Sequence, residues 1–164
     1  MSQSNLLSRV VAKIGKLPAW LRPFAITRMF TSQVRFAGTG AVQFLELEDG
    51  RALLQMKNVR KVQNHIHTIH ATAMALLGET ATGAALGMVL PDSKIPLLKS
   101  LHIDYVKRAQ GTLRAEATLP PEMRARVLAE DKGEGVVPVR VTDETGAEPI
   151  KCQFVWAWIP KKRP

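Results

Sequence analysis

Residues 68–89 read TIHATAMALLGETATGAALGMV, and this stretch decides the fold. Drawn as a helix it is apolar on every side, because alanine, leucine and glycine fill most positions and Glu79 is its only acidic residue. Pro91 marks its end, since proline cannot continue a helix. A helix that is apolar all round must be enclosed on several sides. The sequence therefore predicts a long buried helix with a curved sheet wrapped around it.

The length of this stretch approaches that of a membrane span, which is the competing interpretation. Glu79 would then lie near the centre of a bilayer, where a charged side chain costs about 3 kcal/mol or more. Three threonines and three glycines between residues 71 and 90 dilute the apolar character further. We therefore predict no transmembrane segment and a helix buried within its own protein.

The rest of the chain after residue 40 has the pattern of β-strands separated by turn residues. Asp49-Gly50 is a strong signal for a two-residue hairpin. In the last strand Ile150, Cys152, Phe154, Trp156 and Trp158 share one face by the two-residue period, and this face is expected to press on the helix. The prediction is an α+β protein with an antiparallel sheet of about six strands, at residues 41–48, 51–57, 98–107, 111–119, 136–142 and 150–159.

The N-terminal segment has a composition of its own, since residues 1–45 contain no acidic residue. Apolar residues recur at helical spacing from Leu6 to Ile14 with basic residues between them, and a second helix is predicted from Pro18 to Thr31. Such a segment is typical of a transit peptide or a helix on a membrane surface, although we favour an amphipathic helix packed on its own domain. The predicted organisation is a helical appendage at residues 1–35, one domain at 36–160 and a basic tail at 161–164.

The net charge of +9 is concentrated at the two ends of the chain. Residues 1–62 hold ten Lys/Arg and three Asp/Glu, whereas residues 63–158 hold ten and eleven. We find no recognition helix or basic stripe with aromatic residues, so no nucleic-acid partner is predicted. Cys152 is the only cysteine, and we interpret it as a core residue. Without a disulfide or a secretory signal, the expected location is the cytoplasm.

The densest polar cluster precedes the long helix, in the run from Asn64 to His70. Its three histidines have no cysteine or carboxylate ligand nearby and fit no zinc spacing, so we predict no metal and no cofactor. Glu79 lies among apolar residues, where burial favours its protonated form and suits it to act as a base at neutral pH. The N–H of Ala71, at the start of the helix, has no intrahelical partner and is available to an oxygen that gains negative charge.

The segment NHIHTIHATAMALLGETA, residues 64–81, resembles a motif of the hotdog-fold acyl-CoA thioesterases of the phenylacetyl-CoA type and of their tetrameric relatives. In that group Asn, two residues, Gly, two residues and His introduce the helix, and an Asp or Glu follows nine residues later. Asn64, His70 and Glu79 have these spacings, while His67 occupies the position of the glycine. Residues 99–109, KSLHIDYVKRA, are similar to the strand after the helix, and the resemblance covers roughly residues 36–160.

This resemblance implies a hotdog fold and hydrolysis of an acyl-CoA or related thioester, with coenzyme A present only as part of the substrate. It implies that Glu79 is a general base for water or a nucleophile, that Asn64 orients the water or the carboxylate, and that His70 holds the thioester. Two alternatives remain open at this point: a hotdog hydratase or dehydratase, and an acyl-CoA-binding protein without turnover.

Two further expectations concern binding and assembly. Arg60, Lys61, Lys107 and Arg108 are candidates to contact the phosphates of coenzyme A, although a solvated basic edge is the alternative. His70 and Glu79 are nine residues apart and therefore project from roughly opposite sides of one helix. We therefore expect a homodimer, possibly a dimer of dimers, in which His70 of one chain meets Glu79 of the other.

Overall fold

The computed structural model describes residues 5–161, so Lys162 and Arg163 of the predicted basic tail lie outside the described residues. The helical elements are α1 Leu6–Ile14, η1 Ala19–Leu21, α2 Arg22–Gln33, α3 Arg35–Thr39, η2 Arg60–Val62, α4 Ala71–Gly87 and α5 Pro121–Ala129. The strands are β1 Gln43–Glu48, β2 Arg51–Met56, β3 Lys94–Tyr105, β4 Leu113–Thr118, β5 Gly133–Val137, β6 Val139–Thr142 and β7 Ile150–Pro160.

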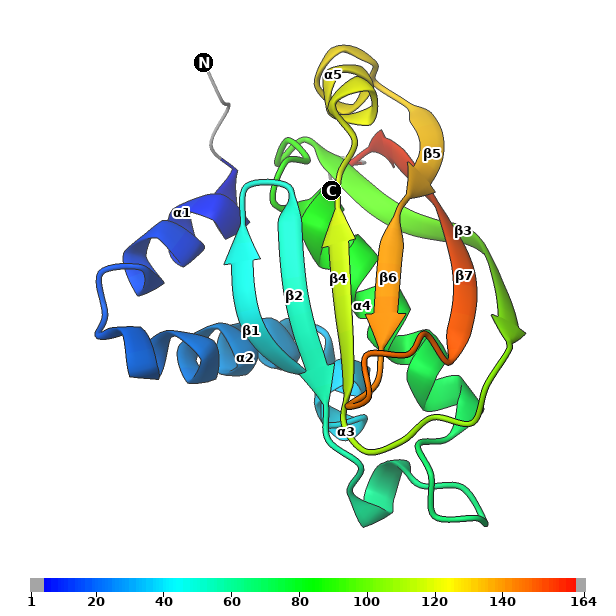
Figure 1. Cartoon of the computed structure of the whole chain (residues 1–164). Coiled ribbons are helices and arrows are strands. Elements are labelled where there is room, and N and C mark those ends of the chain that lie inside the picture. The colour runs from blue at the N-terminus through cyan, green and yellow to red at the C-terminus, as the bar shows by residue number, and fades with distance from the viewer. Residues whose placement is uncertain (1–4, 162–164) are drawn as a thin grey trace.

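The strands curve around α4, as Figure 1 shows, but they do not form the single six-stranded sheet that was predicted. They form a four-stranded sheet in the order β1-β2-β4-β6 and a three-stranded sheet in the order β3-β7-β5, with antiparallel pairing throughout. The strand predicted at residues 136–142 is divided at Pro138, so that β5 pairs with β7 and β6 pairs with β4. Proline has no N–H to donate to a ladder, and here it stands where the chain passes from one sheet to the other.

The long helix is buried as predicted, and glycines on it make room for the aromatic face of β7. A Cβ added at Gly78 would lie 2.7 Å from the Phe154 ring, and one added at Gly83 would lie 2.8 Å from the Trp156 ring. Trp156 Nε1 also donates to Thr82 Oγ1 over 2.9 Å. The predicted contact between the aromatic face of the last strand and the helix is therefore confirmed.

The N-terminal helices pack on the same body. Leu7, Val11 and Ile14 of α1 lie against the core, and the Asn5 side chain caps α1 while its Nδ2 donates to the carbonyls of Gly87 and Leu90 over 2.7 Å each. The apolar face of α1 is thus used within the chain, as we favoured. Among residues 5–161 no helix is both long and apolar enough to cross a bilayer.

Two elements differ from the prediction. The segment between the strands predicted at residues 111–119 and 136–142 was expected only to separate them, but Pro121 begins α5, because a proline at the first helical position loses no hydrogen bond. The strand expected from residue 98 begins at Lys94, whose Nζ donates to the carbonyls of Val127 and Glu130 near the end of α5. The predicted hairpin is confirmed, with Gly50 at φ +76° between β1 and β2.

Candidate active site

A tight loop at residues 63–69 leads into α4, and Asn64 organises it. The loop is closed by a bridge between Gln63 and Ile69. Asn64 Oδ1 accepts the N–H groups of Ile66 and Thr68 over 3.1 Å each, and its Nδ2 donates to Thr68 Oγ1 over 2.9 Å. The side chain expected to orient the water or the carboxylate is thus engaged in its own loop. Its direct effect in this chain is to fix the path of the backbone toward His70.

His67, at the tip of this loop, explains why the resembling motif has a glycine at the same position. Its φ is +61°, in the left-handed region that favours glycine. Two hydrogen bonds to the backbone of His67 hold it there. Its N–H donates to the Asn64 carbonyl over 3.1 Å, and its carbonyl accepts from the side-chain Nδ2 of Asn58 over 3.0 Å. The loop therefore keeps the left-handed turn although the residue carries a Cβ.

His70 is the N-cap of α4. Its Nδ1 accepts the Thr72 N–H over 3.2 Å and lies 2.9 Å from Thr72 Oγ1, while its backbone is extended at φ −64° and ψ 145°. Since Nδ1 accepts from a backbone N–H, the neutral imidazole carries its proton on Nε2. His70 therefore presents an N–H donor to its surroundings from a ring whose orientation is fixed by the helix it caps.

The N–H of Ala71 follows directly. It makes no hydrogen bond within residues 5–161, whereas the next N–H groups, of Thr72, Ala73 and Met74, are all bonded to His70. The Ala71 carbonyl accepts from the Tyr105 hydroxyl over 3.0 Å, which ties the end of β3 to the start of α4. A free donor at the positive end of a helix dipole, beside the His70 ring, is suited to an oxygen that gains charge.

Glu79 lies two turns further along α4 in different surroundings. It is half-buried and borders a cavity of about 300 Å³ whose other walls are mostly apolar, formed by Phe30, Val34, Phe36, Leu76, Thr80, Gly83, Pro96 and Trp156. Its carboxylate has no hydrogen bond or ion pair within the described part of the chain. Thr82, a conceivable partner, bonds instead to the carbonyls of Gly78 and Glu79 and to Trp156. Burial raises the pKa of the Glu79 carboxyl above its ordinary value.

Three walls of this cavity come from residues that the sequence did not single out. Phe30 belongs to α2, Phe36 to α3, and Val34 joins the two helices. Phe30 also packs on Phe44 of β1, with ring centroids 4.6 Å apart. The sequence predicted a helix from Pro18 to Thr31 within an appendage at residues 1–35, but gave no sign that this segment would border the cavity of Glu79.

His70 and Glu79 do not share a cavity within the chain. His70 borders a second cavity of about 220 Å³, together with Lys61 and Thr72 among others. The two cavities adjoin at Phe36 and Leu76, which line both. The arrangement agrees with the helical geometry, which directs residues nine positions apart to opposite sides.

The four basic candidates are all exposed and gather around the loop before α4. Arg60 and Lys61 lie in η2, and Lys61 borders the His70 cavity. Arg108 donates to the Ile66 carbonyl over 3.2 Å, which brings the segment after β3, with Lys107, to the same loop. None of the four forms an ion pair with a carboxylate of residues 5–161.

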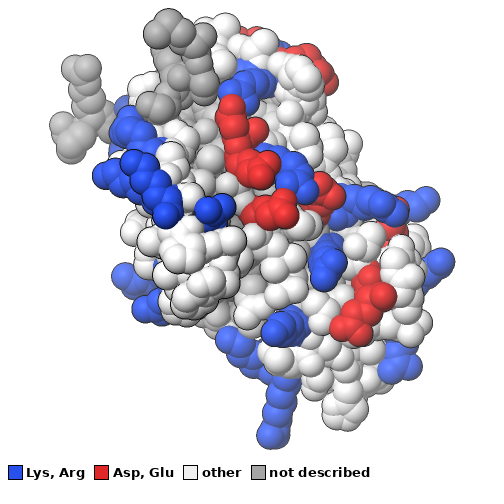
Figure 2. All heavy atoms as spheres, turned by 60° about the vertical axis from the view of Figure 1, so that its left-hand side comes forward, with Lys and Arg blue, Asp and Glu red and all other residues white. Residues whose placement is uncertain are grey.

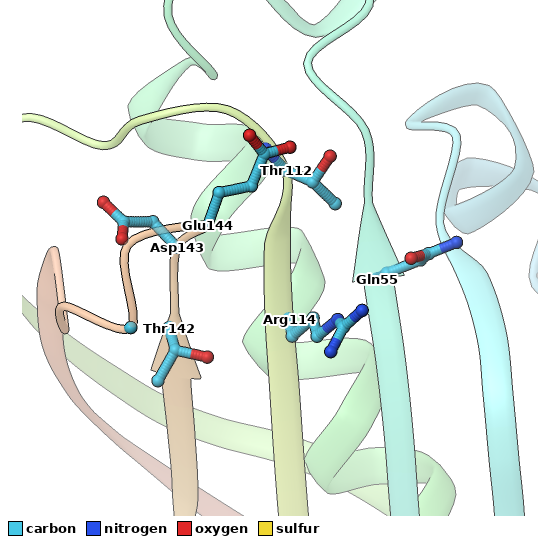
Figure 3. Close-up of a pocket in the computed structure, with 7 residues that line it drawn as sticks. Gln55, Thr112, Arg114, Thr142, Asp143 and Glu144 are labelled. Atoms are coloured by element: carbon cyan, nitrogen blue, oxygen red, sulfur yellow. The ribbon is translucent and has the colours of Figure 1, made fainter.

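A larger cavity, of about 420 Å³, lies away from α4 at one end of the β2-β4-β6 region, and Figure 3 shows its polar lining. Its two carboxylates are engaged in local structure. Asp143 accepts N–H groups of Gln110, Thr145 and Ala147, and Glu144 accepts the N–H of Thr112 over 2.8 Å. These bonds lower the pKa of both carboxyls despite the opposing effect of burial. Two carboxylates held as stable anions by a turn are less suited to proton transfer than Glu79.

One side of α4 and one edge of the sheet are left uncovered. The helix buries most of its residues, but Thr72, Ala75, Glu79 and Gly83, spaced by three or four residues, form a stripe that is only partly covered or exposed. Beside it, β3 is an edge strand that pairs only with β7. On the face of β3 that looks toward the helix, Leu101 is 45% exposed and Tyr105 is 51% exposed.

Within residues 5–161 no three His, Cys, Asp or Glu side chains are grouped closely enough to hold a metal ion. His65 and His67 are both exposed on the loop.

The chain matches one protein family and resembles several solved structures. The model of a family described as a domain of unknown function, DUF4442, matches residues 23–159. No protein with a curated description matches the chain in sequence. Among solved structures, a Pseudomonas aeruginosa protein of unknown function, described as a probable thioesterase, has a TM-score of 0.74 at 22% identity and covers 88% of this chain and 97% of its own.

Two further structures carry the thioesterase name. One from Haemophilus influenzae has a TM-score of 0.63 at 12% identity and covers 76% of this chain and 82% of its own. A variant of a Pseudomonas aeruginosa thioesterase has a TM-score of 0.67 at 12% identity and covers 82% and 94%. At these identities the likeness establishes the hotdog fold, with the central helix packed against antiparallel sheets.

Proposed function

The chain belongs to the DUF4442 family and has the fold of hotdog thioesterases, and from this premise we propose that it hydrolyses an acyl thioester, with Glu79 as its catalytic carboxylate. The substrate class is an acyl-CoA or a related acyl thioester, and the products are a free acid and a thiol. The fold itself hosts several chemistries, so the proposal rests on the site.

The observation that carries the proposal is the state of Glu79. A carboxylate that is half-buried against apolar walls, without a donor from its own chain, costs free energy that nothing in the described residues recovers. Its raised pKa brings it closer to the pH at which a general base works best. Such groups are enriched at functional sites because their environment is arranged for the reaction and not for stability.

The groups present account for each step of hydrolysis. A water oxygen attacks the thioester carbonyl carbon while Glu79 takes the proton from that water. The carbonyl oxygen becomes negative and accepts from the Ala71 N–H and His70 Nε2–H. When the tetrahedral intermediate collapses, the carbon–sulfur bond breaks and the thiolate takes the proton back from Glu79. A direct attack by the carboxylate, giving an anhydride that water then cleaves, uses the same residues.

A two-fold dimer would unite the two halves of the site. The stripe of Thr72, Ala75, Glu79 and Gly83 is partly open, and its residues are small enough for a second α4 to approach closely. The unpaired edge of β3 would be covered at the same time, and uncovered strand edges are otherwise liabilities. In this arrangement His70 and Ala71 of one chain would face Glu79 of the other.

The basic residues give a place for the phosphates of the thiol carrier. Arg60, Lys61, Lys107 and Arg108 surround the loop that positions His70, and no carboxylate of the described chain neutralises them. A polyanionic group attached to the thiol would be attracted to this side while the acyl group enters the apolar cavity of Glu79.

The test is thiol release from a panel of short, medium, long and aromatic acyl-CoAs, with wild type, Glu79→Gln and Glu122→Gln. Glu122 is an exposed carboxylate on α5 and serves as the matched control. Glu79→Gln keeps the shape but deletes the base, so kcat should fall by roughly 100-fold or more while acyl-CoA binding by calorimetry is retained.

Three outcomes would contradict the proposal. A loss of enoyl absorbance without thiol would indicate hydration, and binding without either signal would indicate an acyl-CoA-binding protein. Thiol release that survives in Glu79→Gln at more than about a tenth of the wild-type kcat would remove Glu79 from the chemistry.

A further inference from the structure

The turn between α1 and α2 carries Trp20, the most exposed large apolar side chain of the described chain, and a second exposed aromatic residue, Phe24. Trp20, in η1, is 80% exposed, and Phe24, in the first turn of α2, is 64% exposed. They are four residues apart in a helical stretch and therefore project to the same side. Figure 1 shows this turn at the outer edge of the molecule, away from the sheets. The other two tryptophans, Trp156 and Trp158, are buried at 7% and 0% exposure.

The segment that forms this turn carries charge of a single sign. Residues 1–45 hold six basic residues and no acidic one. Of the basic residues, Lys13, Lys16, Arg22, Arg28 and Arg35 are exposed and form no ion pair with a carboxylate of residues 5–161. Figure 2, which brings this side forward, shows basic side chains spread around an uncharged area. An exposed tryptophan and phenylalanine with unpaired basic residues about them have the composition of a surface that inserts into a lipid interface.

Trp20 and Phe24, at the tip of the α1–α2 turn, are not needed for packing within the chain. The core-facing residues of α1, Leu7, Val11 and Ile14, already pack against the domain. On α2 the residue that is buried is Ile26, two positions beyond Phe24 and on another side of the helix. The matched family domain begins at residue 23, so Trp20 and the whole of α1 precede it. Trp20 therefore lies outside the matched domain, and the side chains of both Trp20 and Phe24 are mostly exposed.

We propose that the α1–α2 turn, with Trp20 and Phe24 at its tip and Lys13, Lys16 and Arg28 around it, binds peripherally to an anionic lipid surface. The two aromatic rings enter the interface between headgroups and acyl chains, and the basic side chains attract the anionic headgroups. This contact differs from the alternative considered from the sequence, in which the apolar face of α1 itself would lie on a membrane surface. That face is occupied by the protein core.

A nucleic acid would use the same positive charge, but the geometry favours a bilayer. The turn at residues 19–24 lies at the outer edge of the molecule (Figure 1), and both of its aromatic side chains are mostly exposed, whereas single-stranded nucleic acid is held along a basic groove. A second copy of the chain would bring two surfaces of equal positive charge together, which opposes association through this turn.

The experiment measures binding of the full chain to two kinds of vesicle. One is phosphatidylcholine alone, and the other contains roughly 30% of the anionic lipid phosphatidylglycerol in phosphatidylcholine. Trp20 provides the signal, because Trp156 and Trp158 are buried and report little change. We expect binding to the anionic vesicles, a shift of tryptophan emission to shorter wavelengths and quenching by brominated lipid. Raising the salt concentration should weaken binding.

Two pairs of variants separate the two components. Trp20→Ala with Phe24→Ala should weaken binding by roughly tenfold or more, whereas Leu128→Ala, at an exposed position on α5, should not. Lys16→Gln with Arg28→Gln should weaken it on the order of 30-fold, whereas Lys132→Gln with Lys151→Gln, at exposed sites elsewhere, should change it by much less.

Several results would overturn the proposal. One is equal binding to neutral and anionic vesicles, and another is unchanged binding after both aromatic residues are replaced. A third is that duplex DNA displaces the protein from vesicles and binds the wild type and the Trp20→Ala, Phe24→Ala variant with equal affinity. An emission shift that depends on protein concentration without vesicles would show that a second copy covers the turn instead. Circular dichroism of each variant establishes that it is folded, so a loss of binding cannot be a loss of structure.

Discussion

The start and the middle of α4 treat their polar groups in opposite ways. At the start, Asn64 is hydrogen-bonded to Ile66 and Thr68, and His70 is hydrogen-bonded to Thr72. The N–H of Ala71 has no partner within residues 5–161 and is held in a fixed position. In the middle, the Glu79 carboxylate has no partner among residues 5–161 and faces apolar walls. The difference indicates a division of labour. The start is a rigid donor site for an oxygen, and the middle carries a destabilised base.

The comparison also separates the two regions in space, because they border different cavities of one chain. The shared-site model makes its largest prediction here. His70→Ala and Glu79→Gln should each be nearly inactive as homodimers. Mixed subunits should form heterodimers that combine His70 of one chain with Glu79 of the other, each with one intact site, and activity should return to about a quarter of the wild-type value on random mixing. Thiol release after co-expression measures this.

The control for this mixing experiment is a second pair with both substitutions in the same chain, mixed with wild type. The shared-site model fails if heterodimers of His70→Ala with Glu79→Gln, verified by mass spectrometry, are as inactive as the two single variants while light scattering shows normal dimers. Both residues would then work within one chain, or neither would be catalytic.

The free N–H of Ala71 gives a prediction confined to the start of the helix. Ala71→Pro deletes this N–H at the first helical position, where proline is favoured, and the extended backbone of His70 tolerates a following proline. Loss of one donor to a developing oxyanion should lower kcat by roughly 100-fold or more, with little change in stability. Ala71→Gly, which keeps the N–H, is the control. Steady-state kinetics and thermal unfolding of both variants decide the point, and a fully active Ala71→Pro would exclude this donor.

Much of this division was visible in the sequence. The apolar stretch around Glu79 predicted the buried helix, and the spacing of Asn64, His70 and Glu79 predicted which polar residues would be placed along it. What the sequence could not supply was contact between segments far apart in the chain. Phe30, Val34 and Phe36 wall the Glu79 cavity because α2 and α3 fold back over the sheet and helix. No local pattern states where a surface helix will dock.

The sequence also did not show how local hydrogen bonds are divided. Asn64 has the spacing of a catalytic motif, yet its amide is engaged by Ile66 and Thr68, two and four residues further along the loop. Pro138 and Pro121 are further cases, because a proline can interrupt a strand, begin a helix or end one, and tertiary contacts decide which.

The middle of the helix should show its character in the dependence of stability and rate on pH. Burial holds the Glu79 pKa above its ordinary value of 4.5 in the folded state, so the folded protein binds this proton more tightly than the unfolded chain. The resulting stabilisation is complete below that ordinary value and is lost as pH rises through the raised pKa. Glu79→Gln should therefore raise the melting temperature more at pH 7 than at pH 4.

The same raised pKa should place the acid limb of kcat/KM above pH 4.5, because only the ionised carboxylate accepts a proton. Melting curves of wild type, Glu79→Gln and the exposed control Glu122→Gln across this range provide the measurement. An equal gain at both pH values, or an acid limb at or below the ordinary value, would mean that the carboxyl is not destabilised by its surroundings.

The smallest expected effect concerns the loop that makes the start of the helix rigid. His67 holds a φ of +61°, a conformation that costs a residue with a Cβ about 1–2 kcal/mol of stability. A glycine at this position avoids that cost but loses about 0.5–1 kcal/mol of stability, because it has more conformational freedom in the unfolded chain. His67→Gly should therefore stabilise the protein by roughly 0.5–1 kcal/mol in urea unfolding, since both main-chain bonds of His67 are kept. His65→Gly is the matched control, because His65 is an exposed histidine of the same loop without a positive φ. It should lose stability through backbone entropy alone. If His67→Gly is no more stable than His65→Gly, the left-handed turn is not strained, and the glycine of the resembling motif serves some purpose other than backbone geometry.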